Sequence, residues 1–260
     1  MTENLEKIPV VFLHGFTGSG DDWMSVIKDL DDVCDPITIN LVGHGTDDPP
    51  QDTSYYTIEE QVKRIRSIAD RVSLDKFVLA GYSMGGRIAL HFAVNHPDRL
   101  YGLILESTTA GIEDDDERKQ RVASDEELAQ FIESNDITAF TDRWMNLPLF
   151  ASQSRLPGGI REEIRAKKLK NSGTALANTL RAAGTGQMQP VWKHLPELTF
   201  PVLLITGSID EKFTGINKRM ASKLPDCSHK IIEDTGHNVH LEQPDLYCRI
   251  VKEFVSAIRE

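Results

Sequence analysis

The sequence has no apolar run long enough to cross a membrane, and it has few cysteines. No stretch approaches the roughly 18 apolar residues that span a bilayer, and the N-terminal MTENLEKIP lacks the apolar core of a secretory signal peptide. Cys34, Cys227 and Cys248 are odd in number and widely spaced, which argues against a disulfide framework and against a zinc cluster. We therefore expect a cytoplasmic protein, and the sequence indicates neither a metal nor an organic cofactor.

Positive charge is also scarce. The chain has 29 Lys and Arg residues against 40 Asp and Glu residues, a formal net charge of -11, so nucleic acid and anionic membranes are not expected partners. The segment from Arg155 to Arg181 is the exception, with seven basic residues against two acidic ones. This contrast favours a small anionic polycarboxylate as substrate, although the same residues would equally form the solvated side of a helix. We expect a monomer or a weak homo-oligomer.

Strand-length apolar runs alternate along the chain with segments of helical period. This alternation is typical of parallel βαβ construction and predicts one α/β domain from the 260 residues. Helices are predicted over Thr57–Ser73, Gly86–Val94 and Pro244–Ile258. The predicted strands are Val10–Leu13, Ile37–Leu41, Phe77–Ala80, Leu103–Leu105, Val202–Thr206 and Lys230–Glu233.

The alternation stops between residues 107 and 198, where Trp, Pro and Gly residues interrupt short amphipathic segments. Ligands of open α/β sheets bind at the carboxyl ends of the strands, so a helical insertion there would act as a lid. We therefore expect a core formed by residues 1–106 and 199–260, with residues 107–198 as a helical lid.

A G-x-S-x-G motif, Gly81-Tyr82-Ser83-Met84-Gly85, lies between a predicted strand and a predicted helix. Glycines on both sides of a serine allow the tight, strained turn that projects its hydroxyl from the sheet. The motif alone arises by chance in many chains, but its position between strand and helix predicts a catalytic serine in an α/β-hydrolase fold.

A serine hydroxyl needs a base to take its proton and a carboxylate to orient that base. His237 follows the last predicted strand, and Asp210 follows Val202–Thr206, which gives the order Ser, acid, His that this fold requires. His240 and Glu211 remain outside candidates for base and acid. The backbone N–H groups of Phe16 and Met84 are the expected oxyanion donors. His14 is expected to be structural, and Gly43-His44-Gly45 to form a turn.

Several motifs together resemble the 2-succinyl-6-hydroxy-2,4-cyclohexadiene-1-carboxylate synthases of the menaquinone pathway, a family commonly called MenH. The resemblance covers nearly the whole chain and is most selective in LHGF, GYSMGGR and a W-x-x-x-P-x-F segment. The matching segments are Val11–Gly20, Gly43–Gly45, Gly81–Leu90, Trp144–Gln153, Gly184–Gln187 and Gly236–Pro244.

The resemblance implies a lyase that eliminates pyruvate from 2-succinyl-5-enolpyruvyl-6-hydroxy-3-cyclohexene-1-carboxylate. It implies the triad Ser83, Asp210 and His237, with the serine acting as the base that removes a ring proton. It also implies substrate contacts by Tyr82, Arg87 and Trp144, and by a lid arginine that corresponds to Arg121 or to Arg118. A further lid arginine of the family is replaced here, with Lys168 nearest to its position.

Two other functions are compatible with the motifs. A carboxylesterase or carbon–carbon bond hydrolase would use Ser83 as a covalent nucleophile. A non-catalytic ligand-binding protein would need none of the three triad residues.

Overall fold

The computed structural model describes residues 7–45 and 48–259. Its centre is a six-stranded sheet in the order β2-β1-β3-β4-β5-β6, in which all neighbouring strands are parallel. This arrangement confirms the predicted α/β class. The strands are β1 (Ile8–Leu13), β2 (Cys34–Ile39), β3 (Phe77–Tyr82), β4 (Leu100–Glu106), β5 (Val202–Gly207) and β6 (Cys227–Ile232).

The central strands were predicted well, and the two edge strands were predicted too late in the sequence. β2 begins at Cys34 and contains Pro36, which an edge strand tolerates because one side of its backbone needs no partner. β6 begins at Cys227 and includes the polar residues Ser228 and His229, which hide it from a search for apolar runs. Edge strands are only partly covered, so hydrophobicity marks them weakly.

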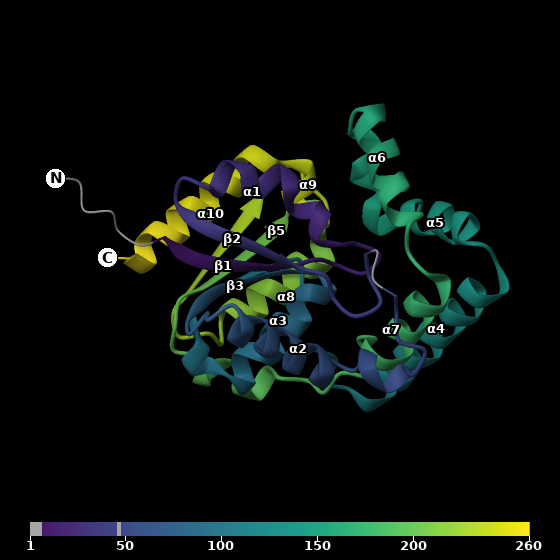
Figure 1. The fold of residues 1–260 in the computed structure, drawn as a ribbon, viewed down its shortest axis with the longest axis horizontal. Helices are drawn as coiled ribbons and strands as arrows, with labels where there is room; N and C mark the ends of the chain where they lie inside the picture. Colours follow the sequence, from purple (N-terminus) through teal and green to yellow (C-terminus); the bar gives the residue numbers. More distant parts are fainter. Residues whose placement is uncertain (1–6, 46–47, 260) are drawn as a thin grey trace.

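Helices cover both faces of the sheet, as expected for a parallel sheet. In Figure 1, α1 and α10 lie above the sheet, and α2, α3 and α8 lie below it. Each face has its own buried apolar cluster. The helices are η1 (Gly20–Trp23), α1 (Met24–Leu30), η2 (Thr53–Tyr56), α2 (Ile58–Arg71), α3 (Met84–Asn95), η3 (Pro97–Arg99), α8 (Glu211–Ala221), α9 (Val239–Glu242) and α10 (Pro244–Arg259).

The local sequence explains α2. Thr57 caps the helix by accepting a hydrogen bond from the Glu60 N–H, and Glu59 and Glu60 stabilise the first turn. Ile58, Val62 and Ile65 are buried against the sheet, on the stripe that the sequence predicts.

A group of helices from between β4 and β5 lies beside the carboxyl ends of the strands (Figure 1). These helices enclose a small apolar cluster of their own, which includes Ile132, Phe140 and Leu180. Residues 188–198 instead pack into the main core through side chains such as Trp192 and Leu195. The elements of this region are α4 (Asp115–Ser134), α5 (Ile137–Met145), η4 (Pro148–Arg155), α6 (Gly158–Lys168), α7 (Gly173–Ala183) and η5 (Trp192–Glu197).

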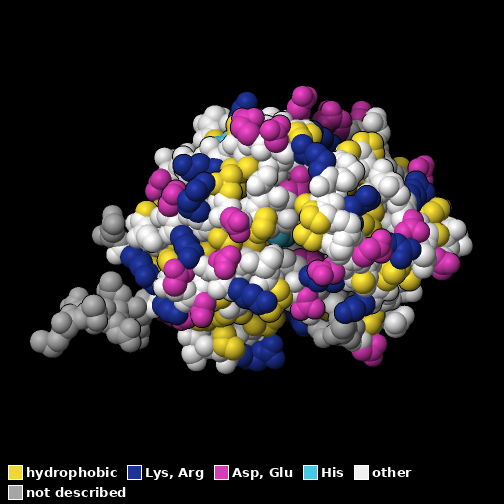
Figure 2. Space-filling model, turned by 90° about the horizontal axis from the view of Figure 1, so that it is seen from above, with side chains coloured by type: hydrophobic (Ala, Val, Ile, Leu, Met, Phe, Trp, Pro, Cys, Tyr) yellow, Lys and Arg dark blue, Asp and Glu magenta, His cyan; other side chains and the backbone are white. Residues whose placement is uncertain are grey.

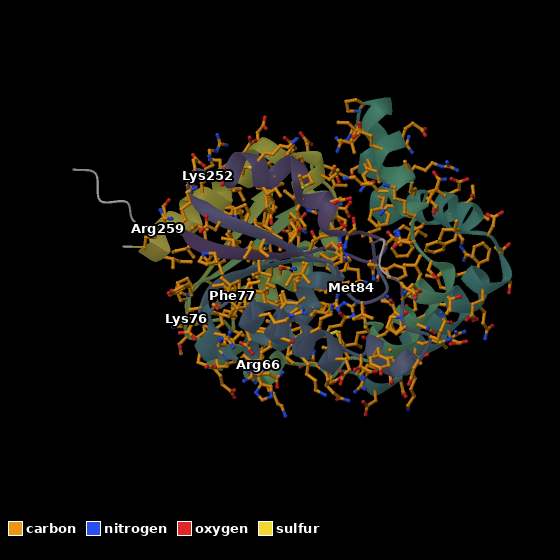
Figure 3. The ribbon with its side chains drawn as sticks, viewed as in Figure 1. Arg66, Lys76, Phe77, Met84, Lys252 and Arg259 are labelled. Atoms are coloured by element: carbon orange, nitrogen blue, oxygen red, sulfur yellow. The ribbon has the colours of Figure 1, made fainter. Side chains whose placement is uncertain are left out.

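The direction of the strands fixes where a site can form. Figure 3 shows Phe77, at the start of β3, on the side of the chain termini, and Met84, just after β3, on the side of α4–α7. Figure 2 shows acidic and basic side chains interspersed over the face that it draws. Within residues 7–45 and 48–259, no helix is long and apolar enough to cross a membrane.

Candidate active site

Ser83 occupies a strained turn between β3 and α3. Its φ is 50°, a left-handed conformation that is uncommon for a residue with a side chain. A Cβ atom at Gly81 would lie 2.5 Å from the Gly85 carbonyl oxygen, and one at Gly85 would lie 2.5 Å from the His14 carbonyl oxygen. The two motif glycines therefore permit the close packing that holds the Ser83 turn.

Three side chains from distant parts of the chain form a continuous hydrogen-bonded chain. The Ser83 hydroxyl oxygen lies 3.1 Å from His237 Nε2, and His237 Nδ1 lies 2.6 Å from Asp210 Oδ2. The Asp210 carboxylate accepts the Nδ1–H bond, which leaves Nε2 free to accept a proton from the serine. The imidazole and the carboxylate are both more than nine-tenths buried.

Asp210 is held by its own helix. It is the N-cap of α8, where its other carboxylate oxygen accepts a hydrogen bond from the Phe213 N–H. The Phe213 ring packs against the His237 imidazole with 4.6 Å between ring centroids. The acid and the base are thus fixed by the same turn of α8.

The alternative base and acid lie elsewhere. The imidazole of His240 pairs with the buried Glu106 carboxylate at 2.7 Å instead of with Ser83. Glu211 is an exposed residue of α8, and the His237 imidazole bonds to Asp210 rather than to it. His14 has a structural arrangement, because Nε2 accepts the Leu41 N–H and burial lowers the pKa of the imidazole to about 4.

Ser83 and His237 open into a cavity of about 420 Å³ between the sheet edge and α4–α7. The volume suits a small organic molecule. Its lining residues are Phe16, Tyr82, Ser83, Met84, Arg87, Thr108, Thr109, Ile112, Arg121, Trp144, Leu149, Phe150, Thr179, Leu180, Ala183, Gly184, Thr185, Lys212, Phe213, Ile216 and His237.

Two arginines line this cavity and share one acidic neighbour. Arg87 is buried, donates to the Ala183 carbonyl oxygen at 2.8 Å, and has its pKa lowered by burial to about 10, so it stays cationic at neutral pH. Arg121 donates to the buried Asp125 carboxylate at 2.8 Å. Two positive charges against one negative charge leave this end of the cavity suited to an anion.

Tyr82 and Trp144 line the cavity, and each side chain carries a hydrogen-bond donor. Burial, reinforced by the nearby Glu106 and Asp210 carboxylates, raises the pKa of the Tyr82 phenol well above its usual value, so its hydroxyl stays protonated. The indole Nε1 of Trp144 is buried and has no hydrogen-bond partner among the described residues. Because buried donors are normally paired, this one needs an additional partner.

The two expected oxyanion donors belong to residues that line the same cavity as Ser83. Met84 is the first residue of α3, and the first N–H groups of a helix have no partner within that helix. Phe16 follows β1, and its ring lies edge-on to Trp144 with 5.1 Å between centroids. Both residues line the cavity, so the backbone segments that carry the two N–H groups lie beside it.

Two residues that the resemblance assigned to substrate binding lie outside this cavity. Arg118 pairs with Asp115 at 3.7 Å and borders a different surface depression. Lys168 donates to the Thr17 hydroxyl at 2.7 Å and lines a small neighbouring cavity together with Phe16 and Tyr82. Burial lowers the pKa of the Lys168 ammonium.

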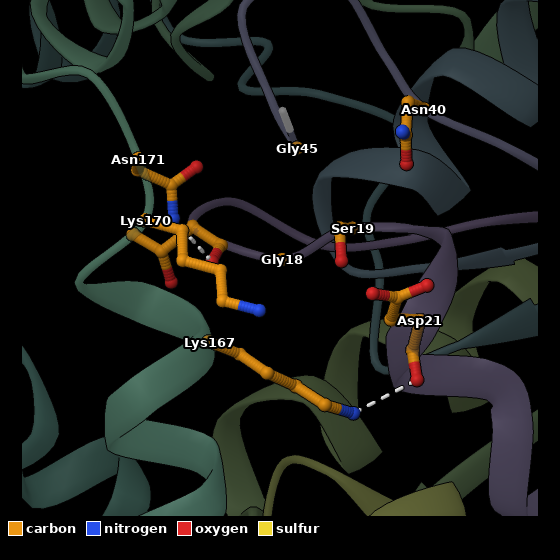
Figure 4. Close-up of a pocket in the computed structure, with 9 residues that line it drawn as sticks. Gly18, Ser19, Asp21, Asn40, Gly45, Lys167, Lys170 and Asn171 are labelled. Carbon is orange, nitrogen blue, oxygen red and sulfur yellow. Dashed lines mark hydrogen bonds between the residues drawn. The ribbon is translucent and has the colours of Figure 1, made fainter. Parts of the chain in front are cut away.

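A separate polar depression lies between the loop after β1 and the end of α6 (Figure 4). In it Lys167 reaches across to donate to the Asp21 carbonyl oxygen at 2.8 Å. Other basic residues of the 155–181 segment also have partners, because Arg165 pairs with Asp142, and Arg181 pairs with Glu126 and Glu133. The positive charge expected to face the substrate is therefore partly neutralised within α4–α7.

Sequence reasoning missed two features of the site. Lys212 lines the cavity from α8, and its position right after Asp210-Glu211 was the only available signal. Glu242 connects the His237 loop to η4, because its carboxylate accepts from the Gly236 N–H and from the Ser152 hydroxyl, both at 2.9 Å. Within residues 7–45 and 48–259, no group of three or more His, Cys, Asp or Glu side chains could hold a metal ion.

Comparison with known proteins gives consistent matches. The family model for the α/β-hydrolase fold matches residues 8–244. The chain is 43% identical over 249 residues to a putative 2-succinyl-6-hydroxy-2,4-cyclohexadiene-1-carboxylate synthase of Bacillus subtilis (strain 168), covering 96% of this chain and 90% of that protein. It is 32% identical over 238 residues to the synthase of Enterobacter sp. (strain 638), covering 90% and 86%. The structure of MenH from S. aureus matches with a TM-score of 0.94 and 36% identity, covering 99% of this chain and 97% of that one.

Proposed function

Because the chain belongs to the α/β-hydrolase fold family and, within it, to the 2-succinyl-6-hydroxy-2,4-cyclohexadiene-1-carboxylate synthases, we propose that it is the pyruvate-eliminating lyase of that name. Its substrate would be 2-succinyl-5-enolpyruvyl-6-hydroxy-3-cyclohexene-1-carboxylate. The observation that carries the proposal is the Ser83–His237–Asp210 chain beneath a cavity that also contains Arg87 and Arg121.

The proposed reaction begins with proton transfer through this chain. His237 Nε2 takes the hydroxyl proton of Ser83, and the Ser83 oxygen removes a proton from the substrate ring. The electrons of the broken C–H bond form a new ring double bond, the existing ring double bond shifts by one position, and the C–O bond to the enolpyruvyl group breaks. The departing enolpyruvate takes up one proton and becomes pyruvate, so the products are pyruvate and the cyclohexadiene.

Negative charge develops on the substrate while the ring proton leaves. We assign its stabilisation to the N–H groups of Phe16 and Met84, where the positive end of the α3 dipole adds to the effect. Asp210 would stabilise the imidazolium that forms on His237. None of these roles requires movement of the triad, because its hydrogen bonds are already formed.

The cavity chemistry supports a polycarboxylate substrate. Arg87 and Arg121 would bind a carboxylate at one end, and Trp144 Nε1 and the Tyr82 hydroxyl would donate hydrogen bonds. We also propose that residues 107–198 work as a lid over the substrate, and that the enzyme acts in the cytoplasm. The free Cys34, Cys227 and Cys248 thiols are consistent with that reducing compartment.

The direct test is to supply the enolpyruvyl substrate and measure pyruvate with a lactate dehydrogenase coupled assay. We expect turnover well above background, and its loss in Ser83→Ala but not in the surface variant Ser222→Ala. Pyruvate release no faster than background would overturn the proposal. A burst of p-nitrophenol from p-nitrophenyl esters together with no pyruvate would instead identify a hydrolase that uses Ser83 as a covalent nucleophile.

A further inference from the structure

A second buried acid–imidazole pair lies directly behind Ser83 and takes no part in the proton relay. The Glu106 carboxylate is fully buried at the end of β4, and His240 is 2% exposed in α9. Glu106 Oε2 accepts the His240 Nδ1–H at 2.7 Å, and Oε1 accepts the His240 backbone N–H at 3.1 Å. Both carboxylate oxygens therefore bind the same residue.

The same glutamate also binds the turn that carries the nucleophile. Its backbone carbonyl oxygen accepts the Ser83 N–H at 2.8 Å, in continuation of the pairing between β3 and β4. Glu106 thus contacts Ser83 through its main chain and the segment that carries His237 through its side chain, because His240 lies three residues beyond His237. One residue connects the two ends of the relay.

Aromatic packing limits the movement of His240. Its ring stacks on Trp23 with 4.0 Å between centroids and 25° between planes. The Tyr82 ring lies between the two histidines, 5.0 Å from the His240 centroid and 5.4 Å from the His237 centroid. A shift of His240 would therefore be transmitted to His237 by the backbone and through Tyr82.

We infer that Glu106 is a positioning residue, which sets the separation of Ser83 Oγ and His237 Nε2 by holding His240. The expected effect on kcat rests on the proposed function, whereas the expected effect on the distance between Ser83 and His237 does not. A misplacement of reacting groups by about 1 Å costs on the order of 100-fold in rate. Glu242 and Asp210 restrain the same loop independently, so loss of the Glu106 contact should lower kcat without abolishing it.

The test compares four variants with the wild type. In Glu106→Gln the amide oxygen still accepts the His240 backbone N–H. The amide NH2 group donates to His240 Nδ1 when the imidazole carries its proton on Nε2. We therefore expect kcat within about threefold of the wild type. Glu106→Met removes both hydrogen bonds and His240→Leu removes the side-chain bond, so each should lower kcat about 10- to 100-fold, with KM within about twofold. Each should also lower the melting temperature, because the remaining partner is buried and unpaired.

The double variant Glu106→Met/His240→Leu separates positioning from stability. It leaves no unpaired polar side chain, and only the backbone N–H of residue 240 loses its acceptor, so its melting temperature should recover part of the way toward the wild type while kcat stays low. If kcat recovers with the melting temperature, or if the single variants keep the wild-type kcat, the pair is only structural. Should a single variant fail to fold, the double variant carries this comparison.

Two further measurements complete the test. His229→Leu breaks a 2.9 Å hydrogen bond to Thr206 between β6 and β5, and should lower the melting temperature with no change in kcat. The NMR resonance of the His237 Nδ1 proton shared with Asp210 should shift or broaden in Glu106→Met and in the double variant. An unchanged resonance in both contradicts the inference. This readout needs no substrate, so it decides the positioning claim even if the wild type releases no pyruvate.

Discussion

Ser83 and His237 are 154 positions apart in the sequence, yet the serine Oγ and the imidazole Nε2 lie 3.1 Å apart. Parallel strands bring them together, because β3 ends next to Ser83 and β6 ends shortly before His237 at the same edge of the sheet. The distance permits direct proton transfer between the two atoms.

Trp144→Phe should raise KM about tenfold with a smaller effect on kcat, because it removes one buried hydrogen-bond donor to the substrate. Phenylalanine retains the edge-on contact with Phe16. The matched control is Trp192→Phe, which loses a bond to the Gly111 carbonyl oxygen in the core and should affect stability alone. Equal KM values for the two variants would argue against a substrate contact by Trp144.

The sequence was sufficient to predict that these three side chains meet at the sheet edge, because their positions follow from connectivity. Ser83 and Asp210 follow apolar strands, His237 follows the more polar edge strand β6, and parallel strands deliver their carboxyl ends to one edge. The glycines beside Ser83 mark the tight turn, and their steric role agrees with the observed positive φ. The family and the fold class, both inferred from these motifs, are confirmed by the comparisons.

Pairings between side chains of α4–α7 could not be predicted in this way. Arg181 binds Glu126 and Glu133 because α7 packs on α4, which no local pattern specifies. Glu106 could have been suspected, since a charged residue that ends an apolar strand needs a buried partner. The identity of that partner, His240, depends on where the loop after β6 returns.

Lys212→Met should raise KM about threefold and leave kcat unchanged, because an exposed cation contributes modestly to binding an anion. The difference from the wild type should shrink at high salt, where surface charges are screened. Steady-state kinetics at low and high ionic strength check this expectation, with Lys223→Met as the control beyond α8. A change in kcat alone would contradict a binding role.

Ser152→Ala should lower kcat several-fold. The substitution removes the hydrogen bond between η4 and Glu242 but keeps the bond from Gly236 to Glu242, and one such bond contributes about 1 kcal/mol. Ser154→Ala is a matched control, because the Ser154 hydroxyl bonds only to the nearby Ala151 carbonyl oxygen among the described residues. Identical kcat values for both variants would show that η4 does not restrain the His237 loop.

His14→Gln should reduce the acid sensitivity of folding. Burial lowers the pKa of His14 from 6.5 to about 4, so between these pH values the unfolded chain binds a proton that the folded chain does not. The stability is complete above pH 6.5 and falls as the pH drops, by about 1.4 kcal/mol per pH unit for this group. Glutamine can still accept the Leu41 N–H.

Urea unfolding of both proteins at pH 7.0 and pH 5.5 checks this expectation. The wild type should lose about 1 kcal/mol more than the variant over that interval. Equal losses would mean that His14 is not held neutral in the folded protein.

The most direct test of the relay is the single-turnover rate of pyruvate release by Asp210→Asn. Asparagine cannot hold His237 in the tautomer that accepts the Ser83 proton, so the rate should fall by about 10⁴ while substrate binding is retained. A rate within tenfold of the wild type would contradict a proton relay through Ser83, His237 and Asp210.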